Sequence, residues 1–219
     1  MSILEAIILG LVQGIAEFLP ISSSGHLAIL QNLFNMSDIE GGHMLFDVLL
    51  HFGTLVAICF MYWPDIRSMF TETIDLFTGR SPAAAGQRKQ YPAARMFMLI
   101  VTATLPLVLI LPVHDYIEAL SGSTIYVGVA LILTGCMLFV LDRMAKGTKT
   151  EKNMLFKDAL IIGLCQCAAT LPGLSRSGTT ITAGIATGHD RRYAVKFSLL
   201  MSIPAVLGAT ILELADAIK

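Results

Sequence analysis

Long apolar segments dominate this chain and restrict what it can fold into more than any other feature. Four of them, residues 44–62, 96–113, 124–141 and 193–215, approach the roughly 20 apolar residues that a helix needs to cross a bilayer. Charged residues make up only 14% of the chain, whereas soluble domains contain about 25%. The sequence therefore predicts an all-α fold, a polytopic bundle of helices surrounded by membrane lipids.

The few charged residues orient these segments. Residues 63–95 and 142–157 are rich in Lys and Arg, whereas residues 35–43 and 114–123 contain none. The positive-inside rule then places the first two loops in the cytoplasm and the last two outside. The net charge is −1 and no basic face is present, so no nucleic-acid partner is expected. Glu5 stands where a secretory leader carries positive charge, so no cleaved signal peptide is expected either.

Two further regions, residues 3–34 and 155–188, each contain a pair of apolar runs that are too short to cross a bilayer. A turn rich in Gly, Ser and Pro joins each pair, so we expect two re-entrant helical hairpins. By the loop charges, the first hairpin enters from outside and the second from the cytoplasm. Both turns contain the pattern Q-x8-S-x-S-G at an offset of 153 positions, which pairs Gln13 with Gln166, although so short a pattern can also arise by chance.

Three spans lie between the hairpins, so a duplication of the hairpin unit would be an inverted-topology repeat, as in many transport proteins. The first repeat is expected to cover residues 1–150, with the hairpin 3–34 and the spans 44–62, 96–113 and 124–141. The second covers residues 151–219, with the hairpin 155–188 and the single span 193–215. Because the second unit is shorter, the repeat predicts that two C-terminal spans are missing.

The first hairpin contains the stretch QGIAEFLPISSSGH, residues 13–26, in which Gln13 and Glu17 share one helical face. A carboxylate at membrane depth costs at least about 2.5–3.5 kcal/mol and therefore needs a cation or a function. A Glu carboxylate with a Gln carbonyl suits a divalent cation, either Mg²⁺ or Ca²⁺. The alternative is a glutamate near the interface that is solvated from outside.

The rest of that stretch predicts a turn and a new helix that starts near His26. Ser22, Ser24 and Gly25 would offer hydroxyl and amide groups to a phosphate at the helix N-terminus. The alternative is a plain helix cap formed by Ser23 or Ser24. Ser23 is also a candidate nucleophile, and His26 is a candidate base, acid or nucleophile, although a lone histidine is more often structural.

The second turn, PGLSRSGTT at residues 172–180, contains Arg176 between two apolar runs with no acidic neighbour in sequence. An arginine in that position needs an anion, and its guanidinium group fits phosphate oxygens. Hydroxyl and amide donors surround it, namely Ser175, Ser177, Gly178, Thr179 and Thr180. The alternative is an ion pair with Glu17, which is compatible with a site that binds phosphate when substrate is present.

Three other features have simpler interpretations. Asp47 and His51 lie four residues apart in a predicted span and would support the site, although a hydrogen-bonded core histidine is the better interpretation of His51. The four cysteines lie in apolar runs and are expected to be small apolar residues in packed helices. Residues 66–77 place their apolar side chains on one face, which predicts either a helix on the inner membrane surface or a disordered loop.

At these two motifs the chain resembles the undecaprenyl-pyrophosphate phosphatase family, the bacitracin-resistance phosphatases. QGIAE at 13–17 fits the family motif (E/Q)xxxE, and PGLSRSGTT at 172–180 fits PGxSRSxxT. The resemblance continues through FDVLLHFGT at 46–54 and covers the whole chain. It implies hydrolysis of undecaprenyl pyrophosphate to the monophosphate in the bacterial inner membrane, at a site open to the outer face.

The resemblance also implies roles for individual residues. Gln13 and Glu17 would handle the divalent cation, and Ser23 or His26 would be nucleophile or base. Arg176, together with Ser175, Ser177 and Thr180, would hold the pyrophosphate. Two departures put activity in doubt, since Gln13 is the less acidic option at its position and the family usually extends for two further spans.

Two other classes of function compete with a phosphatase. A carrier or flippase for a phosphorylated lipid or an anion could use the same pocket, because inverted repeats with two hairpins also describe transporters. A purely structural membrane protein would leave Glu17 and Arg176 unexplained. The sequence does not fix the oligomeric state, and a homodimer remains one option. The phosphatase interpretation requires the Glu17 carboxylate and the Arg176 guanidinium to lie close together.

Overall fold

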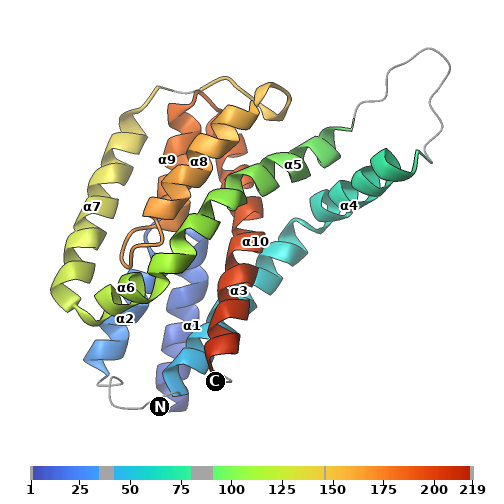
Figure 1. Ribbon diagram of the computed structural model, residues 1–219. Coiled ribbons are helices and arrows are strands. Elements are labelled where there is room, and N and C mark those ends of the chain that lie inside the picture. Colours follow the sequence, from blue (N-terminus) through green and yellow to red (C-terminus); the bar gives the residue numbers. More distant parts are fainter. Residues whose placement is uncertain (1, 35–41, 80–90, 146, 218–219) are drawn as a thin grey trace.

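The computed structural model describes residues 2–34, 42–79, 91–145 and 147–217 (Figure 1). Within these ranges every regular element is helical, which confirms the all-α prediction. The elements are α1 (Ile3–Phe18), α2 (Ser23–Leu33), α3 (Gly42–Met61), α4 (Trp63–Thr78), α5 (Pro92–Thr104), η2 (Leu105–Val113), α6 (His114–Ala119), η3 (Leu120–Gly122), α7 (Thr124–Arg143), η4 (Glu151–Asn153), α8 (Phe156–Ala168), α9 (Arg176–Ala186) and α10 (Arg191–Ala217).

The predicted spans are present as helices. Three stretches, Pro92–Val113, Thr124–Arg143 and Arg191–Leu212, are long and apolar enough to cross a membrane. Phe46–Met61 and Trp63–Thr78 pass the same test only together, and they are bent by 74° at their junction. Pro64 lies in the first turn of α4, where it needs no backbone donor, so a new helix can start there in a new direction. The protein is therefore a multi-pass membrane protein.

The span that begins with α5 changes its geometry part-way. Its α-helix ends at Thr104 and a 3₁₀ helix, η2, continues it to Val113. Pro106 and Pro112 lie in this segment. Proline lacks the backbone N–H that an α-helix requires, which explains why the tighter helix replaces it here.

Two helical hairpins occupy the middle of the molecule. α1 packs on α2, and α8 packs on α9. In Figure 1 the α1–α2 hairpin extends from the end of the bundle that holds both chain termini, and the α8–α9 hairpin extends from the opposite end. α7 lies against both α2 and α9 and so connects the two hairpins.

α10 forms the centre of the main apolar core. It packs against α3, α5 and α9, and buried side chains such as Met96, Leu99, Ile162 and Phe197 meet there. The outer helices have the reverse pattern, since Ile125 of α7 is 83% exposed. Apolar side chains on the outside are what a helix surrounded by lipid requires.

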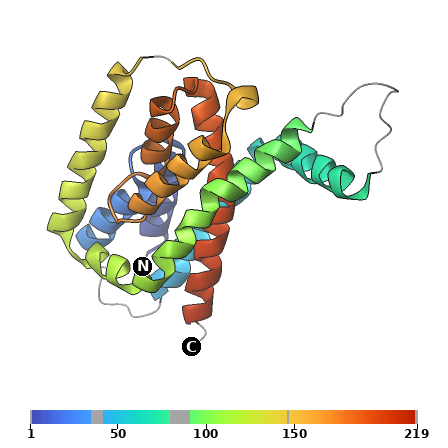
Figure 2. The ribbon, with the colours of Figure 1, turned by 45° about the horizontal axis from the view of Figure 1, so that its top comes forward.

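α4 forms a helix across residues 66–77, so the disordered-loop interpretation of this segment is wrong. α4 and the first half of α5 project together from the bundle in both ribbon views (Figure 2). The Glu72 carboxylate accepts hydrogen bonds from the N–H groups of Ala93 (2.7 Å) and Ala94 (3.1 Å) and so holds the start of α5.

Parts of the loops used for orientation lie outside the described residues. These parts include Arg80, Arg88 and Lys89 of the basic segment and residues 35–41 of the uncharged one. The four cysteines are free thiols. Three of them are partly buried, as expected, but Cys136 is exposed on α7, because it lies on a helix with few packing partners.

Candidate active site

Equivalent serines cap the two hairpin turns with the same hydrogen bond, although φ is 70° at Ser22 and −73° at Ser175. Ser22 Oγ accepts a hydrogen bond from Gly25 N–H at 3.3 Å, and Ser175 Oγ accepts one from Gly178 N–H at 3.0 Å. The N-cap of α2 is therefore Ser22, and the prediction of Ser23 or Ser24 is wrong, because the helix begins at Ser23 rather than near His26. Each cap leaves other N–H groups of the first helical turn without an intrahelical acceptor.

Glycines allow the two turns to touch. A Cβ at Gly25 would lie 3.1 Å from Gly173 Cα, and a Cβ at Gly178 would lie 3.0 Å from the Pro20 carbonyl oxygen. α7 holds the second turn in place, because Thr134 Oγ1 donates to Gly173 O and accepts from Ser175 N–H, both at 3.1 Å. The first residues of α2 and α9 are thereby brought to one place.

At that place Glu17 and Arg176 form an ion pair between the Glu17 Oε1 and Arg176 Nη2 atoms. The phosphatase interpretation of the sequence requires these two groups to lie close together, and they do. Glu17 is 7% exposed, so its charge needs a partner at hydrogen-bond distance. The ion pair proposed as an alternative role for Arg176 is therefore present in this structure.

The second oxygen of Glu17 organises the first hairpin. Glu17 Oε2 accepts hydrogen bonds from Ser23 Oγ at 2.7 Å and from Gln13 Nε2 at 3.2 Å. Gln13 Nε2 also lies 3.0 Å from His51 Nδ1. An amide nitrogen only donates, so His51 Nδ1 is the acceptor and a neutral His51 carries its proton on Nε2.

His26 lies apart from this network. Its Nδ1 is 2.7 Å from the Ser22 carbonyl oxygen. A carbonyl only accepts, so Nδ1 carries a proton and donates it to this hydrogen bond. His26 is not among the residues that line the cavity described next, whereas His51 is.

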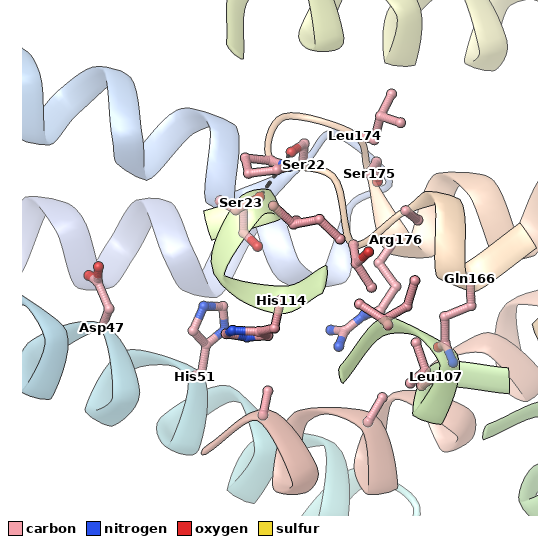
Figure 3. A pocket seen from close by; sticks show the side chains of 18 of the residues that line it. Ser22, Ser23, Asp47, His51, Leu107, His114, Gln166, Leu174, Ser175 and Arg176 are labelled. Atoms are coloured by element: carbon pink, nitrogen blue, oxygen red, sulfur yellow. Dashed lines mark hydrogen bonds between the residues drawn. The ribbon is translucent and has the colours of Figure 1, made fainter. Parts of the chain in front are cut away.

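The site opens into one cavity of about 800 Å³ (Figure 3). Its polar wall includes Glu17, Ser23, His51, Gln166, Ser175 and Arg176, and its apolar wall includes Leu107, Val108, Leu111, Pro204 and Leu212. Asp47 also lines it, with Oδ1 accepting a hydrogen bond from Gln31 Nε2 at 2.7 Å. A cavity with one charged wall and one apolar wall suits an amphiphile with an anionic head.

The donor set fits a divalent cation only in part. In the described part of the chain, no group of three or more His, Cys, Asp or Glu side chains could hold a metal. Gln13 Oε1, however, is buried and has no hydrogen-bond partner among the described residues, one helical turn from the Glu17 carboxylate. One carboxylate and one amide oxygen suit a hard cation that takes its remaining ligands from water and phosphate.

The family described as bacitracin resistance protein BacA matches residues 6–219. The chain belongs to this family. It is 42% identical to an undecaprenyl-diphosphatase of Methanosphaera stadtmanae, across 99% of this chain and 78% of that protein. It is 41% identical to undecaprenyl-diphosphatase 1 of Shouchella clausii, across 100% of this chain and 76% of that protein.

From sequence alone, three residues of this site had either no assigned role or only an uncertain one. Thr134 is a single polar residue in an apolar span and gave no signal. His51 was preferred as a hydrogen-bonded core histidine, with support of the site as the alternative; it is hydrogen-bonded to Gln13 and also lines the cavity. Gln166 was identified only through the repeat, where its equivalence to Gln13 was the available signal.

Proposed function

We propose that this chain is an undecaprenyl-diphosphatase that hydrolyses undecaprenyl pyrophosphate to undecaprenyl phosphate and phosphate. Its relatives carry that name. The observation that carries the mechanism is the contact of Glu17 with both Arg176 and Ser23 at the charged wall of an amphiphilic cavity. The product would re-enter cell-wall synthesis as the lipid carrier.

The site would bind the diphosphate by charge and by helix polarity. Arg176 turns from Glu17 to the phosphate oxygens when substrate enters, because a guanidinium group binds phosphate in a bidentate manner. The N-termini of α2 and α9 both face this point and add free N–H groups. Gln13 and Glu17 would hold Mg²⁺ or Ca²⁺, which supplies further positive charge to the transferred phosphate when bound.

Ser23 is the nucleophile that the geometry favours, with Glu17 as its base. Ser23 Oγ attacks the terminal phosphorus while Glu17 Oε2, 2.7 Å away, accepts its proton. The bond from that phosphorus to the bridging oxygen breaks, and undecaprenyl phosphate leaves with the proton from Glu17. Water then attacks the phosphoserine, Glu17 takes a proton from this water and returns it to Ser23 Oγ, and inorganic phosphate departs.

His26 would have a different role. It contacts the Ser22 carbonyl rather than Ser23, so it fixes the turn that presents the nucleophile. Phosphate release and trapped phosphoenzyme, measured for Ser23→Ala and His26→Ala in the purified protein, test this assignment. We expect Ser23→Ala to abolish both signals and His26→Ala to retain a phosphoserine. A phosphohistidine in Ser23→Ala would reverse the roles.

We infer further that α1–α2 and α8–α9 are re-entrant hairpins of an inverted repeat. Their opposite directions in Figure 1, the matching hydrogen bonds of their capping serines and the contact of their turns support this. With the basic loops in the cytoplasm, the cavity would open to the outer face of the bacterial inner membrane.

A carrier for the same lipid would also use two hairpins. Phosphate release from undecaprenyl pyrophosphate, with and without EDTA, decides between the two. Binding without release would favour the carrier. Release that is unchanged by EDTA would remove the cation from the mechanism.

A further inference from the structure

Gln166 of α8 has a buried amide group that the fold leaves unused. The side chain is 1% exposed. Neither Oε1 nor Nε2 has a hydrogen-bond partner in the described part of the chain. A buried amide without partners is costly, and a folded protein retains one only where something else satisfies it. Gln166 is among the residues that line the cavity with Glu17 and Arg176, which makes it a candidate contact for a ligand bound there.

Comparison with Gln13 shows why the group is free. Gln13 lies 153 positions earlier, at the equivalent place in the first hairpin, and donates to Glu17 and His51. At the same offset from Glu17 the second hairpin has Thr170, whose hydroxyl donates to Cys167 O at 2.7 Å. The second hairpin therefore has the glutamine but lacks the carboxylate that accepts a hydrogen bond from Nε2 of its counterpart, Gln13.

The position of Gln166 within the cavity indicates which part of a substrate it meets. In Figure 3 Arg176 lies between Ser23 and Gln166, and Leu107 of the apolar wall lies on the Gln166 side. α8 packs directly on η2, the element that carries Leu107. An amphiphile with its terminal phosphate at Ser23 and its chain along η2 passes Gln166 in between.

We propose that Gln166 binds the lipid-linked phosphate of the substrate, the phosphate that stays on the product, through a hydrogen bond from Nε2. This inference rests on the proposed diphosphatase function. A neutral donor suits that position, because the departing lipid phosphate must leave the site after the bond breaks and a second arginine would retain it. Arg176 and the helix N-termini hold the terminal phosphate, and Gln166 sets the place of its neighbour.

The two products of the reaction separate these subsites. The test uses the purified protein in detergent and follows conversion of undecaprenyl pyrophosphate by chromatography of the lipid. Inhibition constants are measured separately for undecaprenyl phosphate and for inorganic phosphate, in wild type and in Gln166→Met. Leu164→Ala is the matched control, because Leu164 lies on the same helix, is 50% exposed and does not line the cavity.

Gln166→Met keeps the length of the side chain and removes the amide. We expect the inhibition constant of undecaprenyl phosphate to rise about 10- to 100-fold, the range for one hydrogen bond to a charged group. The inhibition constant of inorganic phosphate should stay within about twofold of wild type. The melting temperature should be unchanged or higher, because the amide makes no internal hydrogen bond that the substitution could break. Leu164→Ala should match wild type in both constants.

Other results would overturn the inference. Equal inhibition constants in wild type and Gln166→Met would show that the amide does not meet the lipid-linked phosphate. A rise only for inorganic phosphate would place it at the terminal phosphate. A large fall in melting temperature would show that the amide stabilises the fold. Absence of any turnover in the wild-type protein would instead refute the diphosphatase function itself.

Discussion

The ion pair between Glu17 and Arg176 yields the sharpest prediction, because its contributions to stability and to activity can be separated. Glu17 is 7% exposed, so Arg176→Met would leave a buried carboxylate with hydrogen bonds but no opposite charge. Breaking a buried pair from one side costs about 3–5 kcal/mol. The Arg176 side chain is 26% exposed, which favours the lower end, near 3 kcal/mol.

For a chain of this size, each kcal/mol lowers the melting temperature by about 2–4 °C. Arg176→Met should therefore melt about 6–12 °C below wild type in the same detergent. Glu17→Gln should cost less, because the partly exposed arginine can turn into the cavity and stay hydrated. The double variant Glu17→Gln/Arg176→Met should recover most of the lost stability, since no uncompensated charge remains.

Activity should not recover in the double variant. Arginines that neutralise a transferred phosphate contribute about 10³–10⁵ in rate, and Glu17 is the proposed base for Ser23. All three variants should therefore lose nearly all phosphate release. Two results would refute the reasoning. One is a double variant whose stability loss equals the sum of the single losses, which would mean that the groups are not coupled. The other is wild-type turnover in Arg176→Met, which would remove the arginine from the mechanism.

One further prediction concerns the contact between the two hairpin turns, and another concerns the buried side chain of His189. Gly25→Ala should cut turnover more than tenfold and lower the melting temperature. Its Cβ would lie 2.8 Å from Leu131 Cδ2 on α7 and 3.1 Å from Gly173 Cα, and overpacking costs about 1–3 kcal/mol. Gly14→Ala, with no atom within 4 Å, is the control and should be neutral or stabilising. His189 is 1% exposed, and burial lowers its pKa below the ordinary value. Near the ordinary pKa the unfolded chain therefore binds a proton at His189 that the folded chain does not. Stability should fall as the pH drops below about 6.5. Melting curves from pH 5.5 to 7.5 should show a weaker pH dependence in His189→Gln, and an identical slope would contradict the assignment.

The sequence predicted the spans well because lipid imposes a composition on each of them independently of the others. Residues 124–141 fall within α7, and residues 193–215 fall within α10. Local backbone chemistry was harder to predict. The change from α5 to a 3₁₀ helix depends on how Pro106 and Pro112 act together with the packing of η2 on α8, and apolar periodicity carries no information on that.

The site was predictable where its chemistry lies within one short stretch. Ser22, Ser24 and Gly25 belong to one turn, and the need of Arg176 for an anion follows from its apolar neighbours. Contacts between distant segments were not predictable in detail. Thr134 is 41 positions from Ser175 in sequence and meets it only in the folded chain. That Ser23 contacts Glu17 rather than His26 could be seen only from the side-chain geometry.

The offset of 153 positions pairs residues of different chemistry in the two hairpin turns. Ser23 and Arg176 are equivalent by that offset, and each is the first residue of a helix behind a capping serine. The capping hydrogen bond is the same in both turns, although the backbone of the capping serine differs, with φ of 70° at Ser22 and −73° at Ser175. In the proposed mechanism, the hydroxyl of the residue after the cap in one turn is the nucleophile and the guanidinium of its equivalent in the other binds the phosphate. The Glu17 carboxylate then has to contact both, because it is the nearest anion for the cation and the nearest base for the hydroxyl. We therefore expect activity to depend on the contact between the turns rather than on either hairpin alone.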